Sequence, residues 1–478
     1  MSSCEEWASI PLAERVSRVC ALRHVLAEDP RPFVDAVRFP SRRSPAETIA
    51  GELTPLADAC RFLERNAAKI LRRKRLGAFG RPLWLAGVDA SIYREPLGTV
   101  LIIGPSNYPL MLPGIQSIQA LVCGNRVLWK PAPGTGCVAA LMSRTFADLG
   151  VPAGAFVALD ETIDSIAPWL AETDKVILTG SRRSGTAVMR TLAEHATPSI
   201  MELSGSDPMI VLPDADLDLV ADCVRFGLQF NGSSSCIAPR RIVADRSVAD
   251  VLACKLTAAL SGVGPVPIPD ETRRMIDDAG RRAIDAGARL IAGRLPCEEA
   301  AAPLLFDFAR PEMSLVREDF MAPVASMIRA DGISDALAVA ADNPRHLGAS
   351  IFGSPRSAEE VARRVEAGSV VINDVIVPTA DPRLPFGGFR GSGFGVTRGA
   401  EGLLEMTRIK TVSTRRHGPR FHLPPEGAHT SDVIRFQLQA VHSRTAWKRL
   451  LGGFHLVASV RRQLRSRAGD KEEGNRAG

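Results

Sequence analysis

The chain lacks the cysteine spacing of a metal site or of a disulfide framework. It has nine cysteines in 478 residues, an odd number, and none of them forms a Cys-x-x-Cys pair. This pattern disfavours a zinc ribbon and structural disulfides. We therefore expect no bound metal, and we expect a reducing compartment, the cytoplasm.

Long apolar runs are also missing. No stretch reaches the length of about 18 apolar residues that a membrane-spanning helix needs, so we expect no such helix. The first 16 residues have no basic head followed by an apolar core. We expect no secretory signal.

Net positive charge is absent outside the last part of the chain. The net charge is +6, yet residues 416–478 hold 12 Lys and Arg against 5 Asp and Glu. Residues 1–415 are therefore near neutral and offer no basic surface for nucleic acid. The basic character belongs to the tail.

Residues 1–415 contain patterns typical of helices and patterns typical of strands. Residues 12–26 and 46–73 carry apolar side chains at helical spacing, and residues 82–94 resemble an exposed hairpin around Gly87. Short apolar runs that predict buried strands, separated by helical patterns, occupy residues 98–104, 125–130, 175–180, 209–212, 241–243, 325–328 and 368–373. This order predicts an α/β fold of two or three domains with mostly parallel sheets.

Cys236 is the first candidate for chemistry. Most free cysteines are small buried hydrophobic residues, and that ordinary explanation applies to any cysteine taken alone. Here Asn231 and a run of small residues, 232–235, precede the thiol. Such a loop leaves open space around the sulfur and free N–H groups for a thiolate or an oxyanion.

Glu202 is the second candidate. We expect it after a strand, in a loop within residues 201–208 that contains several small residues. A lone glutamate of this kind is most often solvated. Close to Cys236, however, it could be the base that activates water against a thioester.

Two further motifs follow predicted strands. Gly180 and Gly185 flank Ser181 between a strand and a helix, which permits a phosphate site at the helix N-terminus, although an ordinary strand–helix turn explains them equally well. Asn107 follows the strand at 98–104 and could donate to an oxyanion, or could simply be a turn residue.

Taken in this order, the four motifs resemble the aldehyde dehydrogenase superfamily over about residues 10–415. Further matching segments are Trp-Lys-Pro at 129–131, 318–324 and 384–393. The short N-terminus and the Gly-Ser-Gly-Phe-Gly run at 391–395 look most similar to the branch that handles fatty and aromatic aldehydes.

The resemblance implies a domain organisation. It implies a Rossmann-like cofactor-binding domain over 1–205, an α/β domain with the catalytic thiol over 206–375 and a return to the cofactor domain over 376–415. A small β arm, formed by 82–94 and a strand near 408–413, would join subunits into a homodimer or homotetramer. Residues 416–478 form a basic extension.

The resemblance also implies a reaction, the oxidation of an aldehyde to a carboxylic acid with NAD or NADP. Cys236 would attack the aldehyde, Asn107 and the Cys236 N–H would hold the oxyanion, and Glu202 would activate water against the thioester. Splitting one oxidation into two easier steps suits sulfur, a good nucleophile and a good leaving group.

By the same resemblance, the cofactor would contact six residues, which are Lys130, Gly180, Ser181, Gly185, Asp319 and Met321. Asp319 and Met321 replace the glutamate and phenylalanine usual beside the nicotinamide ribose. Pro133 stands where the family often has a glutamate that binds the ribose 2′-OH. The absence of this carboxylate removes a reason to reject NADP. Serines at 204, 206 and 233 replace the usual glycines and lysine and could crowd the cofactor.

Two other functions remain open. A CoA-acylating aldehyde dehydrogenase or an acyl reductase is possible, although relatives of that kind usually lack the glutamate base. A catalytically silent scaffold is compatible with the serines around the site and with Pro133.

The tail contains a basic amphipathic segment. Residues 444–467 hold seven Lys and Arg and no acidic residue, with apolar side chains at helical spacing. Such a helix either docks on protein, which is the commoner case, or lies on an anionic membrane surface. We expect residues 468–478 to be disordered.

Overall fold

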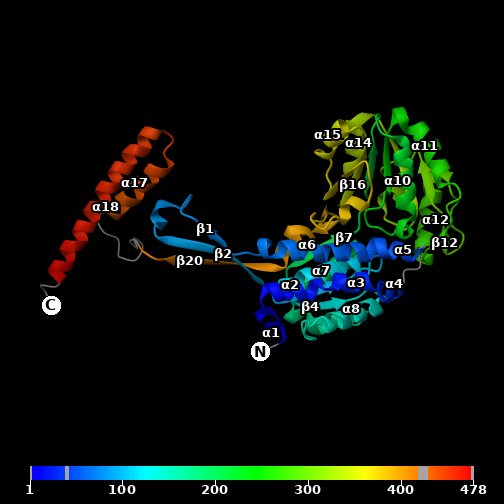
Figure 1. Ribbon diagram of the computed structural model, residues 1–478. Coiled ribbons are helices and arrows are strands. Elements are labelled where there is room, and N and C mark those ends of the chain that lie inside the picture. Colours follow the sequence, from blue (N-terminus) through cyan, green and yellow to red (C-terminus); the bar gives the residue numbers. More distant parts are fainter. Residues whose placement is uncertain (1–2, 38–41, 43, 418–428, 475–478) are drawn as a thin grey trace. The chain divides into compact units, whose positions relative to one another are not determined.

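The structure, a computed structural model, describes residues 3–37, 42, 44–417 and 429–474 (Figure 1). The chain divides into two compact units. The first contains residues 1–74 and 92–411, and the second contains residues 75–91 and 412–478. The predicted α/β fold with mostly parallel sheets is confirmed.

A six-stranded sheet forms the first layer of the larger unit. Its order is β19-β7-β6-β3-β4-β5, and all neighbouring strands are parallel except β19, which runs antiparallel to β7. The strands are β3 (Thr99–Ile103), β4 (Arg126–Lys130), β5 (Phe156–Ala158), β6 (Lys175–Gly180), β7 (Ser199–Leu203) and β19 (Gly393–Phe394). The strand order reverses beside β3, and ligands bind at the carboxyl ends of strands at such a point.

A seven-stranded sheet forms the second layer, in the order β11-β13-β14-β9-β8-β16-β17. Its strands are β8 (Pro208–Val211), β9 (Arg241–Asp245), β11 (Arg289–Ala292), β13 (Leu304–Asp307), β14 (Val324–Ala330), β16 (Gly348–Phe352) and β17 (Ser369–Ile372). Only the β11–β13 pair is antiparallel. Two-stranded pairs join β10 (Val266–Pro267) to β12 (Ala300–Ala301) and β15 (Arg345–His346) to β18 (Phe389–Arg390).

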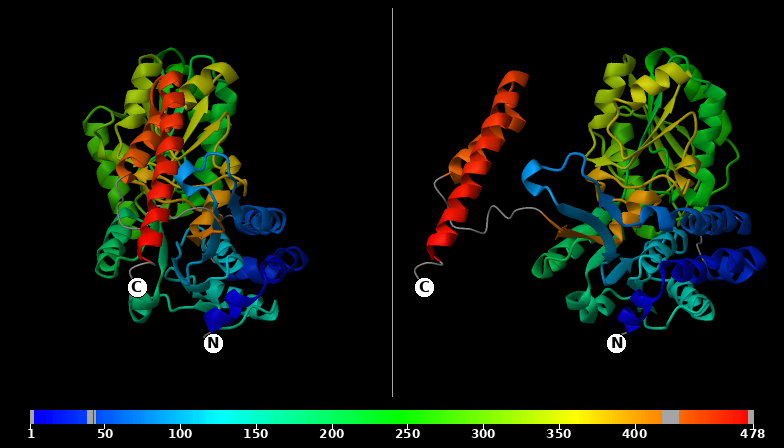
Figure 2. Two further views of the ribbon diagram at one scale, coloured as in Figure 1. Left: turned by 90° about the vertical axis from the view of Figure 1, so that its left-hand side faces the viewer. Right: turned by 60° about the vertical axis from the view of Figure 1, so that its left-hand side comes forward.

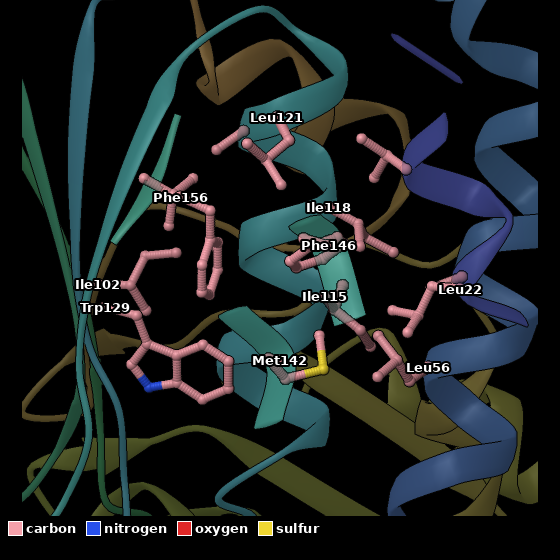
Figure 3. Packing of buried hydrophobic residues seen from close by; sticks show 14 of the residues in the cluster. Leu22, Leu56, Ile102, Ile115, Ile118, Leu121, Trp129, Met142, Phe146 and Phe156 are labelled. Atoms are coloured by element: carbon pink, nitrogen blue, oxygen red, sulfur yellow. The ribbon is translucent and has the colours of Figure 1, made fainter. Parts of the chain in front are cut away.

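Helices surround the first sheet. They are α1 (Ser3–Ser9), α2 (Leu12–Cys20), α3 (Leu22–Glu28), α4 (Arg31–Ala36), α5 (Pro45–Thr48), η1 (Ile49–Leu53), α6 (Thr54–Ile70), α7 (Met111–Val122), α8 (Gly136–Asp148), η3 (Ile163–Glu172), α9 (Arg182–His195) and α16 (Gly399–Glu405). The buried helix α7 packs between the sheet and α2 and α6, and its Ile115 and Ile118 lie in one apolar cluster with Leu22 of α3 and Leu56 of α6 (Figure 3). The Trp7 indole donates to the Leu121 carbonyl at 2.9 Å and fixes α1 to this core.

The second sheet has its own helices. They are α10 (Leu217–Gln229), η4 (Phe230–Ser233), α11 (Arg246–Leu260), α12 (Asp270–Asp285), α13 (Ser314–Arg317), α14 (Gly332–Ala341), α15 (Pro355–Ala362) and η5 (Val377–Ala380). Asp216 and Asp245 cap the N-termini of α10 and α11 by accepting backbone N–H bonds.

A third sheet, in the order β1-β2-β20, comprises β1 (Lys74–Leu76), β2 (Val88–Pro96) and β20 (Thr407–Arg415). The predicted hairpin over 82–94 is wrong, because η2 (Leu83–Leu85) precedes the single strand β2 there. The strand expected near 408–413 is confirmed as part of β20.

The tail forms two helices that run side by side, α17 (Thr430–His442) and α18 (Ala446–Gly474) (Figure 2). Phe436 stacks on His455, and Gln463 donates to Thr430 at 2.8 Å. The helix predicted over 444–467 is confirmed in its main part, whereas the prediction of disorder from 468 is wrong as far as 474, because α18 continues to that point. Residues 475–478 lie outside the described part of the chain.

Within the described residues, no helix is long and apolar enough to cross a membrane. The same residues contain no group of three or more His, Cys, Asp or Glu side chains that could hold a metal ion.

Candidate active site

A cavity of about 600 Å³ opens where β3, β6 and β7 end. Its walls include Glu202 on β7 and the loop residues Asn107 and Cys236. Of the described cysteines, only Cys236 lines it. The structure therefore brings together the three predicted catalytic residues, which lie up to 129 positions apart in the sequence.

A strained turn carries the thiol. After α10 ends, Asn231, Gly232 and Ser233 adopt φ angles of 52°, 60° and 59°. Only glycine takes such angles without cost, and each non-glycine residue costs on the order of 1 kcal/mol or more. Strain of this size persists only where neighbouring contacts hold the backbone in place.

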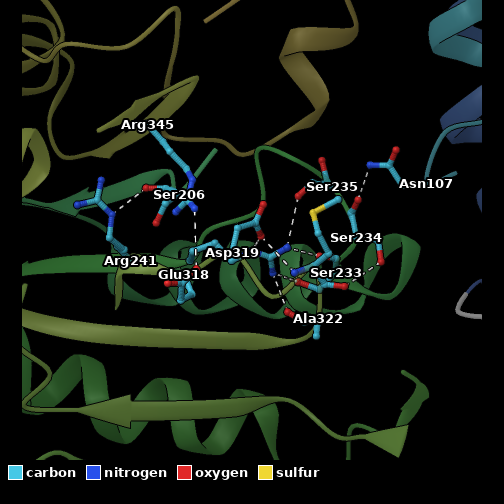
Figure 4. Close-up of polar contacts among 12 residues, drawn as sticks. Asn107, Ser206, Ser233, Ser234, Ser235, Arg241, Glu318, Asp319, Ala322 and Arg345 are labelled. Atoms are coloured by element: carbon cyan, nitrogen blue, oxygen red, sulfur yellow. Dashed lines mark hydrogen bonds and ion pairs between the residues drawn. The ribbon is translucent and has the colours of Figure 1, made fainter. Parts of the chain in front are cut away.

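Arg240 supplies those contacts from beneath the turn. It is 6% exposed and donates through Nη1 to Ser233 Oγ at 2.6 Å and to the Ala322 carbonyl at 2.8 Å. Its Nη2 donates to the Ser233 carbonyl at 2.5 Å, and its Nε lies 3.5 Å from Asp319 Oδ1. Figure 4 shows Ser233, Asp319 and Ala322 gathered in this cluster. The serine at 233, which the sequence suggested could crowd the cofactor, is part of this support.

The thiol is difficult to ionise in this setting. Burial, followed by the carboxyl groups of Asp207 and Glu202, raises the pKa of Cys236 far above its ordinary value. The guanidinium of Arg398 acts in the opposite direction. A reactive thiolate therefore depends on nearby positive charge and N–H donors.

Glu202 lies on β7, not in the loop that the sequence suggested. The small residues that follow it do begin a loop, but Glu202 itself pairs with Gly393 of β19 and is 3% exposed. Thr397 Oγ1 donates to Oε1, and Thr179 Oγ1 donates to Oε2 at 3.1 Å. Burial raises the pKa of Glu202, which the hydroxyls and Arg398 partly offset.

Asn107 points at the thiol loop (Figure 4). Its Nδ2 donates to the Ser234 carbonyl at 2.6 Å, while its Oδ1 accepts from the Tyr108 N–H at 3.0 Å. One hydrogen of the Nδ2 amino group therefore remains for a ligand. The backbone carbonyl of Asn107 is fixed by Asn231 Nδ2 at 2.9 Å and by Arg42 Nη2 at 3.1 Å.

The predicted cofactor residues of the first sheet lie near its carboxyl edge. Lys130 is the last residue of β4, Gly180 is the last of β6, and Ser181 caps α9 by accepting from the Ser184 N–H. A Cβ at Gly180 would meet only Leu178, so the backbone there is open to close approach. Gly180 and Ser181 line the cavity.

Gly185 has another reason to be glycine. It lies buried in α9, and a Cβ there would come within 2.6 Å of Leu203 Cδ2 on β7. Its small size is thus explained by helix–strand packing, and its predicted contact with the cofactor stays a prediction.

Asp319 and Met321 line the cavity from the second sheet's side. Asp319 Oδ1 accepts from the Met321 N–H at 3.1 Å, while the buried Oδ2 has no hydrogen-bond partner among the described residues. An unpaired acceptor beside the thiol suits a ribose hydroxyl. Together with the open backbone at Gly180, it fits a nicotinamide nucleotide.

Several residues at the site were not found from the sequence. Thr179, Thr397, Arg240 and Arg398 surround the thiol and the carboxylate, and no motif singled them out. Glu161 was missed as well, although its carboxylate accepts from the Gly134 and Gly136 N–H groups at 2.7 and 2.5 Å. It interacts electrostatically with Lys130, so a carboxylate is present near that lysine although Pro133 supplies none.

Comparison with known proteins agrees with this geometry. The sequence pattern of the aldehyde dehydrogenase family matches residues 2–412. A 4,4'-diapolycopene aldehyde oxidase of a Methylomonas species is 30% identical over 427 residues, which cover 86% of this chain and 79% of that relative. A probable NADP-linked succinate-semialdehyde dehydrogenase of Synechocystis is 30% identical, covering 85% and 91%. The crystal structure of a Mycobacterium tuberculosis aldehyde dehydrogenase with NAD+ superposes with a TM-score of 0.78 at 26% identity, covering 85% and 86%.

Proposed function

Because the chain belongs to the aldehyde dehydrogenase family and is an NAD(P)-dependent aldehyde dehydrogenase, we propose that it forms its carboxylic acid through a thioester on Cys236. The observation that carries the proposal is that Cys236, Glu202 and Asn107 line one cavity. A nucleophile, a base and an amide donor around one space are what acyl transfer requires.

The residues divide the work as follows. The Cys236 thiolate bonds to the aldehyde carbon, and the free hydrogen of the Asn107 amino group and the Cys236 N–H stabilise the oxygen anion of the adduct. NAD or NADP, when bound, would supply the hydride acceptor that oxidation of this adduct to a thioester requires. Glu202 then takes a proton from water, water oxygen bonds to the acyl carbon, and the carbon–sulfur bond breaks to release the acid and the thiolate.

Six residues would hold the nucleotide. Lys130 would bind the adenosine ribose, Gly180 and Ser181 would border the pyrophosphate with α9, and Asp319 Oδ2 would accept from the nicotinamide ribose. Gly185 and Met321 would complete the contacts. A buried glutamate in the cavity argues against transfer of the acyl group to CoA, because the base serves water.

The substrate is proposed to be an apolar aldehyde. The side chains of Met111, Leu112, Phe230, Ile376 and Val377 line the cavity. They would desolvate an alkyl, polyene or aromatic group, whereas a charged tail would lose its hydration there. The similarity to a relative named 4,4'-diapolycopene aldehyde oxidase agrees with this chemistry.

Two partners are proposed. A second copy of the chain would bind through β2 and β20, which include most of 82–94 and all of 408–413. An anionic membrane surface would bind α18, where Trp447, Leu450 and Phe454 are 72%, 59% and 75% exposed. Exposed basic residues accompany this apolar set, namely Lys448, Arg449, Arg461, Arg462 and Arg465. We propose a cytoplasmic enzyme with peripheral membrane contact.

The test of the proposed function is the Cys236→Ala variant. We expect the oxidation of a medium-chain aliphatic aldehyde to fall by at least about a thousandfold, because a covalent pathway is lost. Reduction of NAD or NADP is followed by absorbance, with Cys223→Ala, a buried cysteine outside the cavity, as the matched control. Turnover by Cys236→Ala at the rate of the control would overturn the proposal.

A further inference from the structure

Arg398 has a backbone conformation that is unusual for its residue type. Its φ of 62° and ψ of 171° lie in a region that only glycine visits readily. The preceding residue is Thr397, whose hydroxyl donates to Glu202. A strained residue that follows a direct contact of the proposed base points to a function for its side chain.

The side chain is buried in the active-site cavity. Arg398 is 5% exposed and lines the same cavity as Cys236 and Glu202. Its Nη1 donates to the Thr379 carbonyl at 2.8 Å, and its guanidinium carbon lies 4.2 Å from the centre of the Phe386 ring. Its buried Nε has no hydrogen-bond partner among the described residues.

A purely structural role accounts poorly for this arrangement. One carbonyl and one aromatic ring could hold a neutral donor, whereas a buried cation without a counter-charge is costly. The buried Arg240, by comparison, lies next to the Asp319 carboxylate. Arg398 forms no ion pair within 4.0 Å among the described residues. The anionic groups that act on it are Glu202 and Cys236.

We propose that Arg398 is a positioning residue, a fixed cation in the active-site cavity that keeps the Cys236 sulfur and the Glu202 carboxylate in their anionic, reactive forms. The proposal rests on the proposed function, in which both groups react as anions. Burial raises the pKa of each group, and Arg398 lowers both. The other charged groups acting on Cys236 are Asp207 and Asp319, which favour the neutral thiol, and Arg240, which is paired with Asp319.

The first experiment compares Arg398→Gln with Arg398→Lys in the full-length protein. Iodoacetamide alkylates Cys236 at a rate proportional to its thiolate fraction. Mass spectrometry of the Cys236 peptide distinguishes this alkylation from that of the exposed cysteines at 137, 254 and 297. We expect the glutamine variant to react at least about tenfold more slowly near pH 8, with its profile displaced to higher pH by about one unit or more. The lysine variant should stay within about threefold of wild type, because it retains the charge. The exposed Arg356→Gln serves as the charge-removal control.

Arg398→Gly tests the structural alternative. Glycine suits φ 62° and ψ 171°, so this variant should melt at or above the temperature of the glutamine variant while its turnover remains as low. If Arg398 had only a structural role, the turnover of the variants would instead rise and fall with their melting temperatures. Unchanged alkylation and turnover in Arg398→Gln would overturn the inference. If Cys236→Ala is inactive at the same time, the proposed function stands and only the role of Arg398 is lost.

Discussion

At the scale of single residues, the site depends on two groups that burial makes reluctant to ionise. Glu202 and Cys236 both have raised pKa values, and burial is the main cause in each case. The proposed reaction requires both as anions. The hydroxyls of Thr179 and Thr397 and the charge of Arg398 oppose burial at Glu202.

The raised pKa of Glu202 predicts a pH dependence. A carboxyl with a raised pKa holds its proton at mildly acidic pH, where an exposed glutamate has already lost it. Since only the ionised form accepts a proton from water, thioester hydrolysis should fall as pH drops through the raised value. We expect steady-state turnover between about pH 5 and pH 9 to show an acid limb above the ordinary glutamate range. Turnover that stays level down to about pH 5 would contradict the assignment.

The sequence indicated the residues of the proposed reaction better than it indicated their surroundings. Cys236, Glu202 and Asn107 stand in small-residue motifs whose order carries the resemblance. Thr397 contacts Glu202 although 195 positions separate them in the sequence. Arg398, the next residue, is brought to the site by the same tertiary contact. No local pattern encodes such a contact, because it arises only when β19 pairs with β7.

At the scale of elements, α9 and β7 approach each other closely. Gly185 permits this, since an added Cβ would come within 2.6 Å of Leu203 Cδ2. Leu203 follows Glu202 directly, so α9 packs against the neighbour of the proposed base. The size of residue 185 therefore sets how closely α9 approaches the strand that carries Glu202.

This contact predicts the effect of Gly185→Ala. We expect it to lower the free energy of unfolding by about 1–3 kcal/mol through overpacking, partly offset by the better helix propensity of alanine. Urea unfolding measures it, with Gly264→Ala as the control, where a Cβ meets nothing within 4 Å. If the two variants have the same free energy of unfolding, the Leu203 side chain moves aside without loss of stability.

Apolar runs predicted most strands correctly, whereas two elements were misjudged. The hairpin over 82–94 failed because Trp84, 55% exposed, lies in a 3-10 turn and not in a strand. The partners of β2 come from β1 and from β20, some 300 positions later. Glu202 was expected in a loop because small residues follow it, yet pairing with β6 and β19 extends the strand past it.

At the scale of the whole molecule, a near-neutral body continues into a basic helical pair. The sequence predicted the amphipathic helix from its spacing, but not that α17 would pack against α18. Even with that packing, Trp447 and Phe454 remain largely exposed. An uncovered apolar set with basic neighbours is typical of a membrane-surface helix.

The tail therefore predicts binding to vesicles. The full-length protein should co-sediment with vesicles containing phosphatidylglycerol and much less with phosphatidylcholine alone, and added salt should weaken binding. Replacing both Trp447 and Phe454 by alanine should weaken binding at least about tenfold, because two large apolar groups leave the interface. Trp84→Ala controls for loss of an exposed tryptophan elsewhere. Absence of binding to either vesicle would favour a protein partner for α18.

The central claim is that Cys236 carries an acyl group that Glu202 helps to release. The most direct measurement is the mass of Glu202→Gln protein mixed with a medium-chain aldehyde and NAD or NADP. We predict one added acyl group, located on the peptide that contains Cys236, together with one equivalent of reduced nucleotide and little further turnover. Reduced nucleotide without an acyl group on Cys236, or an acyl group on another residue, would contradict the account.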